Sequence, residues 1–211
     1  MDPATRLARS LRPLVADRRV LDAIASVPRE LFVPPAVREQ AYDDCALPIG
    51  RGQTISQPLI VARMLALLEL QPDDRVLDVG TGSGWHAALL SRLVAHVWTI
   101  ERHPGLSRWA AANLAAAGIG GDAVTVLEGD GSRGLPQQAP FDAINVAAAA
   151  WPDLPQPLVD QLAAGGRLVA PVGGEGQRLV LLERSGDGAE LRRTQLEQVR
   201  FVPLVAGEAG G

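Results

Sequence analysis

Three glycines follow an apolar run in the stretch VLDVGTGSGW, residues 76–85. Gly80, Gly82 and Gly84 lie between a predicted buried strand and a predicted helix, which is where an open α/β sheet binds its ligand. Glycine at these positions lets the backbone approach that ligand closely. A dinucleotide-binding loop would carry glycine at position 85 to seat a pyrophosphate on the helix start, but Trp85 stands there. NAD and FAD are therefore disfavoured.

Acidic residues near the ends of three predicted strands favour S-adenosylmethionine instead. Its amino-acid end is a zwitterion, which backbone amides and a carboxylate network around Asp78 can hold without a phosphate cradle. Glu101 is placed to accept hydrogen bonds from two ribose hydroxyls. Asp130 is placed to reach an adenine amino group, and Gly131 leaves room for the ring. The glycine loop alone is compatible with a turn that binds nothing, but three such acids together indicate a cofactor site.

The elements that position these residues alternate between strands and amphipathic helices, which predicts βαβ units and a parallel sheet. Strands are expected at 75–80, 96–101, 123–130, 141–148 and 166–173, and helices at 85–94, 104–118 and 154–166. Residues 177–185 and 191–204 indicate a terminal hairpin with a turn at 185–190. The expected fold is a doubly wound, Rossmann-like α/β sheet with a C-terminal antiparallel strand pair.

The first part of the chain has a different texture, with Arg and Asp among Leu, Val and Ala at helical spacing, interrupted by prolines. We expect short helices there, and therefore a helical annex over residues 1–50 packed on a main domain over residues 51–211. At 211 residues the chain can bury one sizeable core.

Composition excludes several function classes. A net charge of −4 gives no broad basic surface for nucleic acid or an anionic membrane. The single Cys45 excludes an internal disulfide. His86, His96 and His103 have no metal-binding spacing, so no metal is expected. Together with the absence of a signal-peptide core at the start, this composition predicts a cytoplasmic protein.

Several stretches resemble the protein-L-isoaspartate O-methyltransferase family. The most specific are VPRELFVPP at 27–35, GQTISQP at 52–58, LDVGTGSGWHAALL at 77–90 and VRFVPL at 199–204, and the similarity extends from Val20 to Leu204. The family resemblance implies transfer of a methyl group from S-adenosyl-L-methionine to the carboxylate of L-isoaspartyl residues in damaged peptides and proteins. Repair then proceeds through a succinimide, and S-adenosyl-L-homocysteine is the other product.

The resemblance also implies roles for individual residues. Ser56 matches the active-site serine and is expected to contact the substrate carboxylate. The residues that match the cofactor site are Thr54, Ile55, Asp78, Gly80, Thr81, Gly82, Ser83, Gly84, Glu101, Arg102, Asp130 and Gly131. The residues that match the peptide cleft are Ala148, Val202, Pro203 and Leu204.

Two features keep alternatives open. On spacing alone, Ser56 is suited to be the N-cap of the apolar helix that follows it. Trp151 enters the loop after the fourth strand, where the family usually has a proline sooner. An altered loop is compatible with a carboxyl methyltransferase for one dedicated biosynthetic peptide or a small acid. A third alternative, from another class, is a non-catalytic module that binds S-adenosylmethionine and a partner. We expect a monomer.

Overall fold

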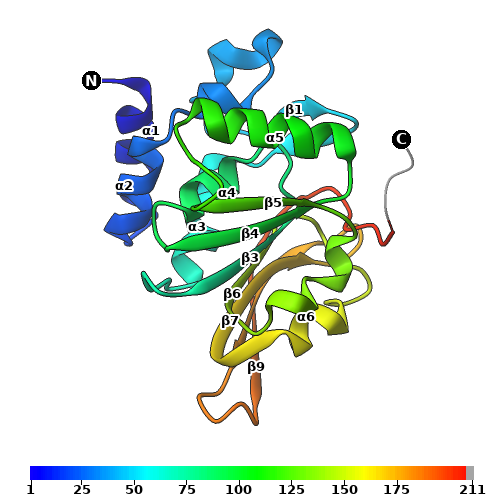
Figure 1. Cartoon of the computed structure of the whole chain (residues 1–211). Coiled ribbons are helices and arrows are strands. Elements are labelled where there is room, and N and C mark those ends of the chain that lie inside the picture. Colours follow the sequence, from blue (N-terminus) through cyan, green and yellow to red (C-terminus); the bar gives the residue numbers. More distant parts are fainter. Residues whose placement is uncertain (208–211) are drawn as a thin grey trace.

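A computed structural model describes residues 1–207, which form a seven-stranded sheet with helices on both faces (Figure 1). The sheet order is β5-β4-β3-β6-β7-β8-β9. The strands are β3 (Arg75–Val79), β4 (His96–Glu101), β5 (Val124–Glu128), β6 (Phe141–Val146), β7 (Leu162–Val172), β8 (Arg178–Arg184) and β9 (Leu191–Gln198). β3 to β7 are parallel, and β8 and β9 form an antiparallel pair beyond β7. The chain reverses its winding direction between β3 and β6, which is the usual ligand position in such sheets.

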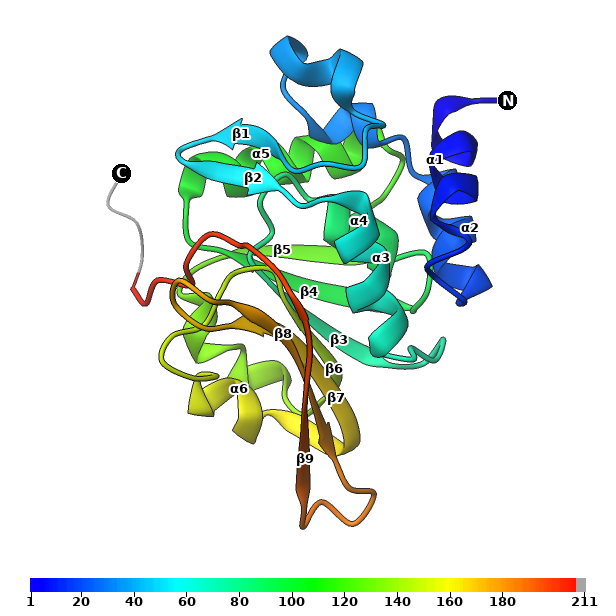
Figure 2. The same ribbon diagram turned by 180° about the vertical axis from the view of Figure 1, so that it is seen from behind.

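The two faces of the sheet bury different layers because the side chains alternate along each strand. Val76 and Val97 face a core shared with α3 (Pro58–Leu67), α4 (Trp85–Leu90) and α5 (Pro104–Ala116). Leu77 and Ile144 face the second core, with Leu158 of α6 (Gln156–Asp160). Two short 3₁₀ turns, η3 (Gly131–Arg133) and η4 (Pro136–Gln138), follow β5. Figure 2 shows α3 and α4 on one side of the sheet and α6 on the other. The doubly wound α/β prediction is therefore confirmed.

The N-terminal segment contains the expected short helices and one small sheet. α1 (Pro3–Leu11) and α2 (Arg18–Ser26) are followed by the 3₁₀ turns η1 (Arg29–Phe32) and η2 (Pro35–Gln40). Asp2 and Asp17 cap α1 and α2 through their carboxylates. A hairpin of β1 (Leu47–Gly50) and β2 (Gln53–Ile55) then leads into α3. The annex boundary expected after residue 50 falls in the turn of this hairpin, and residues 208–211 of the expected main domain lie outside the described chain.

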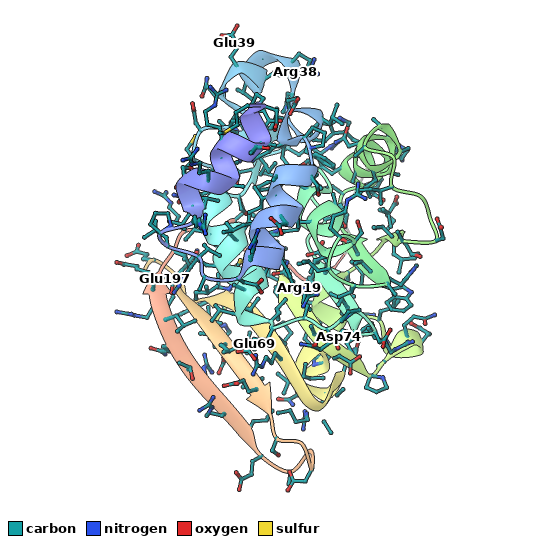
Figure 3. The ribbon with its side chains drawn as sticks, turned by 90° about the vertical axis from the view of Figure 1, so that its left-hand side faces the viewer. Arg19, Arg38, Glu39, Glu69, Asp74 and Glu197 are labelled. Carbon is teal, nitrogen blue, oxygen red and sulfur yellow. The ribbon has the colours of Figure 1, made fainter. Side chains whose placement is uncertain are left out.

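Arginine side chains join distant parts of the chain. Arg19 of α2 donates to the carbonyl oxygens of Leu70 at 2.6 Å and Leu93 at 3.0 Å, and so holds α2 against the segments that follow α3 and α4 (Figure 3). Arg63 of α3 forms an ion pair with Glu197 of β9 at 2.9 Å. No helix within residues 1–207 has both the length and the apolar character needed to cross a membrane.

The expected helix over 154–166 is wrong beyond its first half. The helix ends at Asp160, and Leu162 already belongs to β7. The carbonyl oxygen of Gln161 accepts the N–H of Phe141 at 2.8 Å, and the Gln161 side chain bonds to Leu135 and Arg133. These tertiary bonds draw the Ala- and Gly-rich residues that follow into the sheet despite their low strand propensity.

Candidate functional site

The glycine loop forms one wall of a small cavity at the carboxyl ends of β3 and β4. Gly80, Gly82 and Gly84 all have positive φ angles, of 91°, 55° and 94°, which explains why glycine stands at each of them. The N–H of Gly80 donates to the carbonyl oxygen of Ile100 at 2.9 Å, so the loop is fixed to β4. The cavity has a volume of about 100 Å³. It is lined by Gln53, Val79, Gly80, Gly82, Ile100, Glu101, Arg102, His103, Gly131, Ala147, Ala148, Val202, Pro203, Leu204 and Val205.

Glu101 ends β4 and is held by backbone donors on both sides. One carboxylate oxygen accepts the N–H of Gly82 and the other accepts the N–H of His103, each at 2.9 Å. The residue is only 5% exposed, yet its carboxylate borders the cavity. An ionised carboxylate has further acceptor sites beyond two hydrogen bonds. The geometry therefore leaves Glu101 able to accept from a pair of ligand hydroxyls, as expected for a ribose.

Gly131 lies at the opposite end of the cavity floor. A Cβ atom built on Gly131 would lie 2.6 Å from Cγ1 of Val79, closer than any side chain tolerates. The absence of a side chain at this position therefore lets η3 lie directly against β3. Because Gly131 and Ile100 both line the small cavity, the missing side chain also leaves room there for a ligand.

Asp130 caps the turn next to this floor and reaches the C-terminal segment. One carboxylate oxygen accepts from both the N–H and the hydroxyl of Ser132, at 3.0 and 2.6 Å. The other accepts the N–H of Gly207 at 2.7 Å, and Nε of Arg102 donates to the Gly207 carbonyl at 3.2 Å. Burial alone would raise the pKa of Asp130, but the bonds from Ser132 and Gly207 lower it below its usual range. The C-terminal segment thus crosses between Arg102 and Asp130.

Asp78 is fully buried on the other face of β3 and does not line the cavity. Its two oxygens accept from Asn145 Nδ2 and Thr99 Oγ1, each at 2.7 Å. These residues are its register partners on β6 and β4. Burial raises the pKa of Asp78 to about 6 despite these two bonds. Asp78 joins three strands at the point where the glycine loop begins.

A second and larger cavity, of about 960 Å³, opens beside the first. Gln53 lines the small cavity, and the next residue, Thr54, lines the large one. Likewise, Val202 lines the small cavity and the preceding Phe201 lines the large one. The large cavity is lined by Ala46, Thr54, Ser56, Gln57, Ile60, Gly174, Glu175, Gln177, Gln198, Val199, Arg200 and Phe201. The two cavities share no lining residue, but consecutive residues line them at Gln53–Thr54 and at Phe201–Val202, so they approach each other at these two segments.

Ser56 faces the large cavity and does not cap α3, so the N-cap prediction was wrong. The N-cap is Gln57, and its side chain makes no capping bond. Asp44 takes this role from a distant loop, since its carboxylate accepts the N–H of Leu59 at 2.8 Å and Nε2 of Gln57 at 2.9 Å. Among residues 1–207, the Ser56 hydroxyl has no hydrogen-bonding partner, and Ser56 lines the cleft. The hydroxyl is therefore available to a ligand.

The C-terminal part of the cleft wall is fixed by a short parallel bridge. The N–H of Ala149 donates to the carbonyl oxygen of Val202, and the N–H of Leu204 donates to that of Ala149, both at 2.8 Å. Ala148 and the segment Val202–Leu204 thus come together at the small cavity and do not line the large cleft, where a peptide was expected.

Of the other residues expected at the cofactor site, Thr54 lines the large cavity, and neither cavity is lined by Ile55, Thr81, Ser83, Gly84 or Asp130. Ile55 is buried in the core, the Thr81 hydroxyl shares a hydrogen bond with Thr99, and the carbonyl of Ser83 accepts from Asn113. The residues that sequence reasoning missed in the two walls include Gln53, His103, Glu175, Gln177 and Arg200. Gln53 belongs to the GQTISQP motif and could have been included. Arg200 belongs to the VRFVPL stretch and could also have been included, whereas Glu175 comes from a loop that no local signal marks.

Comparisons with known proteins give the family. A family comparison matches residues 6–209 to protein-L-isoaspartate(D-aspartate) O-methyltransferase. The chain belongs to this family. A protein-L-isoaspartate O-methyltransferase of Roseiflexus castenholzii is 56% identical over 200 residues, which cover 94% of this chain and 89% of the relative. One of the same name from Methanoregula boonei is 55% identical over 192 residues, covering 90% and 86%.

Solved structures agree on the fold. A protein-L-isoaspartate O-methyltransferase structure has a TM-score of 0.83 at 27% identity, covering 98% of this chain and 65% of its own. A Plasmodium falciparum structure of the same class, solved with S-adenosyl-L-homocysteine, has a TM-score of 0.79 at 24% identity and covers 97% and 99%. The seven-stranded sheet of this family member is thus that of known methyltransferases.

Proposed function

We propose that this protein transfers a methyl group from S-adenosyl-L-methionine to the carboxylate of L-isoaspartyl residues in damaged peptides and proteins. Repair would then begin through a succinimide. The observation that carries the proposal is that consecutive residues, Gln53 and Thr54, line the two cavities. A small pocket walled by the glycine loop and Glu101 opens beside a peptide-sized cleft lined by Ser56. Family membership supports both the methyl donor and the acceptor.

The small cavity fits the cofactor in its chemistry. Glu101 offers carboxylate lone pairs, and the missing side chain at Gly131 leaves room for a ring. When bound, S-adenosylmethionine supplies an electrophilic methyl group on a sulfonium centre. Asp78, which was expected to contact the cofactor, is proposed to support the loop by joining β3 to β4 and β6.

The reaction does not require the protein to transfer a proton. A carboxylate with an unperturbed pKa near 4 is already ionised at neutral pH, so no general base is needed. The carboxylate oxygen forms a bond to the methyl carbon as the carbon–sulfur bond breaks, and the bonding pair stays on the sulfur. The chain contributes alignment, which in well-oriented systems is worth about 7 to 11 kcal/mol. The Ser56 hydroxyl would hold the acceptor carboxylate by a hydrogen bond and leave its negative charge in place. An arginine would neutralise that charge.

The test uses labelled S-adenosylmethionine and two peptides that differ only in isoaspartyl or normal aspartyl at one position. We expect base-labile methyl ester on the isoaspartyl peptide alone. Equal labelling of both peptides, or of neither, would contradict the proposed substrate. Gel filtration on the same sample checks the proposed monomer, and cell fractionation checks the proposed cytoplasmic location.

Trp151 favours one second candidate, a carboxyl methyltransferase with a dedicated peptide substrate. Its side chain is 71% exposed, and a Cβ built on Gly174 would lie 3.6 Å from its ring. Because Gly174 lines the large cleft, the indole stands at the rim of that cleft. An exposed indole at a binding rim selects for an apolar or aromatic neighbour. Under this candidate, one peptide in a panel that varies the residues beside isoaspartate would dominate turnover, and Trp151→Ala would remove that preference.

A further inference from the structure

Arg29 is a fully buried charged residue that lines neither cavity. It lies in η1 of the annex and is 0% exposed. Burial lowers its pKa to about 10, so the guanidinium remains charged at neutral pH. A buried charge is costly unless its donors are satisfied. The arrangement around Arg29 therefore points to a role that a neutral side chain would not fill.

The guanidinium donates to backbone carbonyl oxygens from two separate segments. Nη1 donates to Ala41 at 2.6 Å, and Nη2 donates to Cys45 at 3.1 Å and to Ser56 at 3.0 Å. Its central carbon also lies 4.9 Å from the ring centre of Trp85. Trp85 is the first residue of α4, directly after the glycine loop. One side chain thus touches the annex, the serine of the cleft and the helix that follows the cofactor loop.

Ser56 depends on such an anchor because no regular element fixes it. β2 ends at Ile55 and α3 begins at Pro58, so Ser56 lies in the link between them. Asp44 holds the start of α3 beyond Ser56. The Ser56 carbonyl itself is bonded by Arg29. Since the guanidinium is packed against Trp85, this bond links the serine backbone to the helix that follows the glycine loop.

We propose that Arg29 is a positioning residue for methyl transfer, whose guanidinium fixes the backbone of Ser56 relative to the glycine-loop helix and thereby aims the serine hydroxyl into the cleft. This inference rests on the proposed function, in which Ser56 contacts the acceptor. It assigns the buried arginine of the annex to the active site through Ser56, and not to contact with substrate or cofactor.

The first test is Arg29→Lys, which keeps the charge but loses the planar fork that reaches both segments. We expect kcat for an isoaspartyl peptide to fall at least tenfold, while the dissociation constant of S-adenosyl-L-homocysteine changes less than threefold. Arg19→Lys is the matched control. It alters an arginine that also donates to two carbonyls between annex and main domain, remote from the cleft. That variant should keep kcat within twofold.

A double-mutant cycle with Ser56→Ala separates positioning from general stabilisation. If Arg29 acts through Ser56, Arg29→Lys should cost less than threefold in the Ser56→Ala background. Independent, multiplicative losses would overturn the proposal. Hydrogen exchange of the amides at 54–57 gives a readout that needs no activity, and these amides should exchange faster in Arg29→Lys than in Arg19→Lys. Unchanged exchange would also overturn it.

Two arrangements keep the outcome decisive. If the wild type shows no transfer to the isoaspartyl peptide, the proposed function fails, while the exchange experiment still tests the anchoring of Ser56. If Arg29→Lys melts without cooperativity, both measurements are made on Arg29→Gln with saturating S-adenosyl-L-homocysteine, whose binding stabilises the native state. Wild-type exchange at 54–57 in that folded variant would contradict the proposal.

Discussion

The carboxylate of Glu101 accepts the backbone N–H of Gly82 at 2.9 Å, so the last residue of β4 holds the middle of the glycine loop. Its other oxygen accepts the N–H of His103 at 2.9 Å. A single side chain therefore fixes two segments that both line the small cavity. The same carboxylate borders the space where a ribose is expected, so loop geometry and ligand recognition depend on one group.

Glu101→Gln should weaken cofactor binding at least tenfold. A glutamine side chain has one acceptor oxygen, so it cannot accept from both backbone amides and a ribose as a carboxylate does. Titration calorimetry with S-adenosyl-L-homocysteine checks this. Glu128→Gln is the control, because Glu128 lies in register with Glu101 on β5 but is exposed. Equal affinities for the two variants would contradict the role of Glu101.

The sheet could be predicted because its parallel strands are apolar on both faces and are separated by amphipathic helices. The end of α6 could not be predicted, because it depends on a hydrogen bond from the N–H of Phe141 to the carbonyl oxygen of Gln161. Local helix propensity carries no information on this distant contact. The β1–β2 hairpin was also missed. Arg51 in its turn has a φ of 51°, a conformation that the residue type does not signal.

The sequence predicted the lining residues well at glycines, where the backbone conformation requires that residue type. It predicted them less well where the direction of a side chain decides whether a residue lines the cavity. Gly80, Gly82, Gly131 and Glu101 line the small cavity, whereas Gly84 does not. Val79 lines the small cavity, and side chains alternate along the strand. The carboxylate of Asp78 therefore points to the opposite face of β3. That alternation is present in the sequence. Direct contact of Asp78 with the cofactor stays a prediction. Glu175 lines the large cavity from the loop between β7 and β8, and the sheet order that places this loop is not a local property of the sequence.

Gly131→Ala should reduce both stability and cofactor affinity. The new methyl group would lie 2.6 Å from Val79 Cγ1, and an overpacked core costs about 1 to 3 kcal/mol. Relief of the clash would displace η3 from the cavity floor. Urea unfolding and calorimetry measure the two effects. Gly129→Ala is a close control, because its Cβ would meet only Ile100 at 4.0 Å. Similar losses in both variants would show that the clash is not the cause.

Ser56→Ala should lower kcat by roughly 10²-fold, the scale found when one preorganised donor is removed. Its hydroxyl has no partner within residues 1–207, so the unfolding free energy should change by less than about 0.5 kcal/mol. Steady-state kinetics and urea unfolding check this. Ser91→Ala, which removes a hydroxyl bonded to the Ala88 carbonyl, should leave kcat unchanged. Wild-type turnover in Ser56→Ala would remove the serine from the mechanism.

Asp78→Asn should change how stability depends on pH. In the folded protein the pKa of Asp78 is raised to about 6 by burial, from 3.8. The native state therefore favours the protonated form, and its contribution to stability is complete below pH 4 and lost as pH rises through 6. At about 1.4 kcal/mol per pKa unit, the loss is about 3 kcal/mol. Asparagine does not titrate, so the variant does not lose this stability. Measured by urea unfolding, its free energy of unfolding relative to the wild type should rise by that amount between pH 4 and pH 7. A pH-independent difference would mean that the Asp78 carboxyl keeps its ordinary pKa in the folded state.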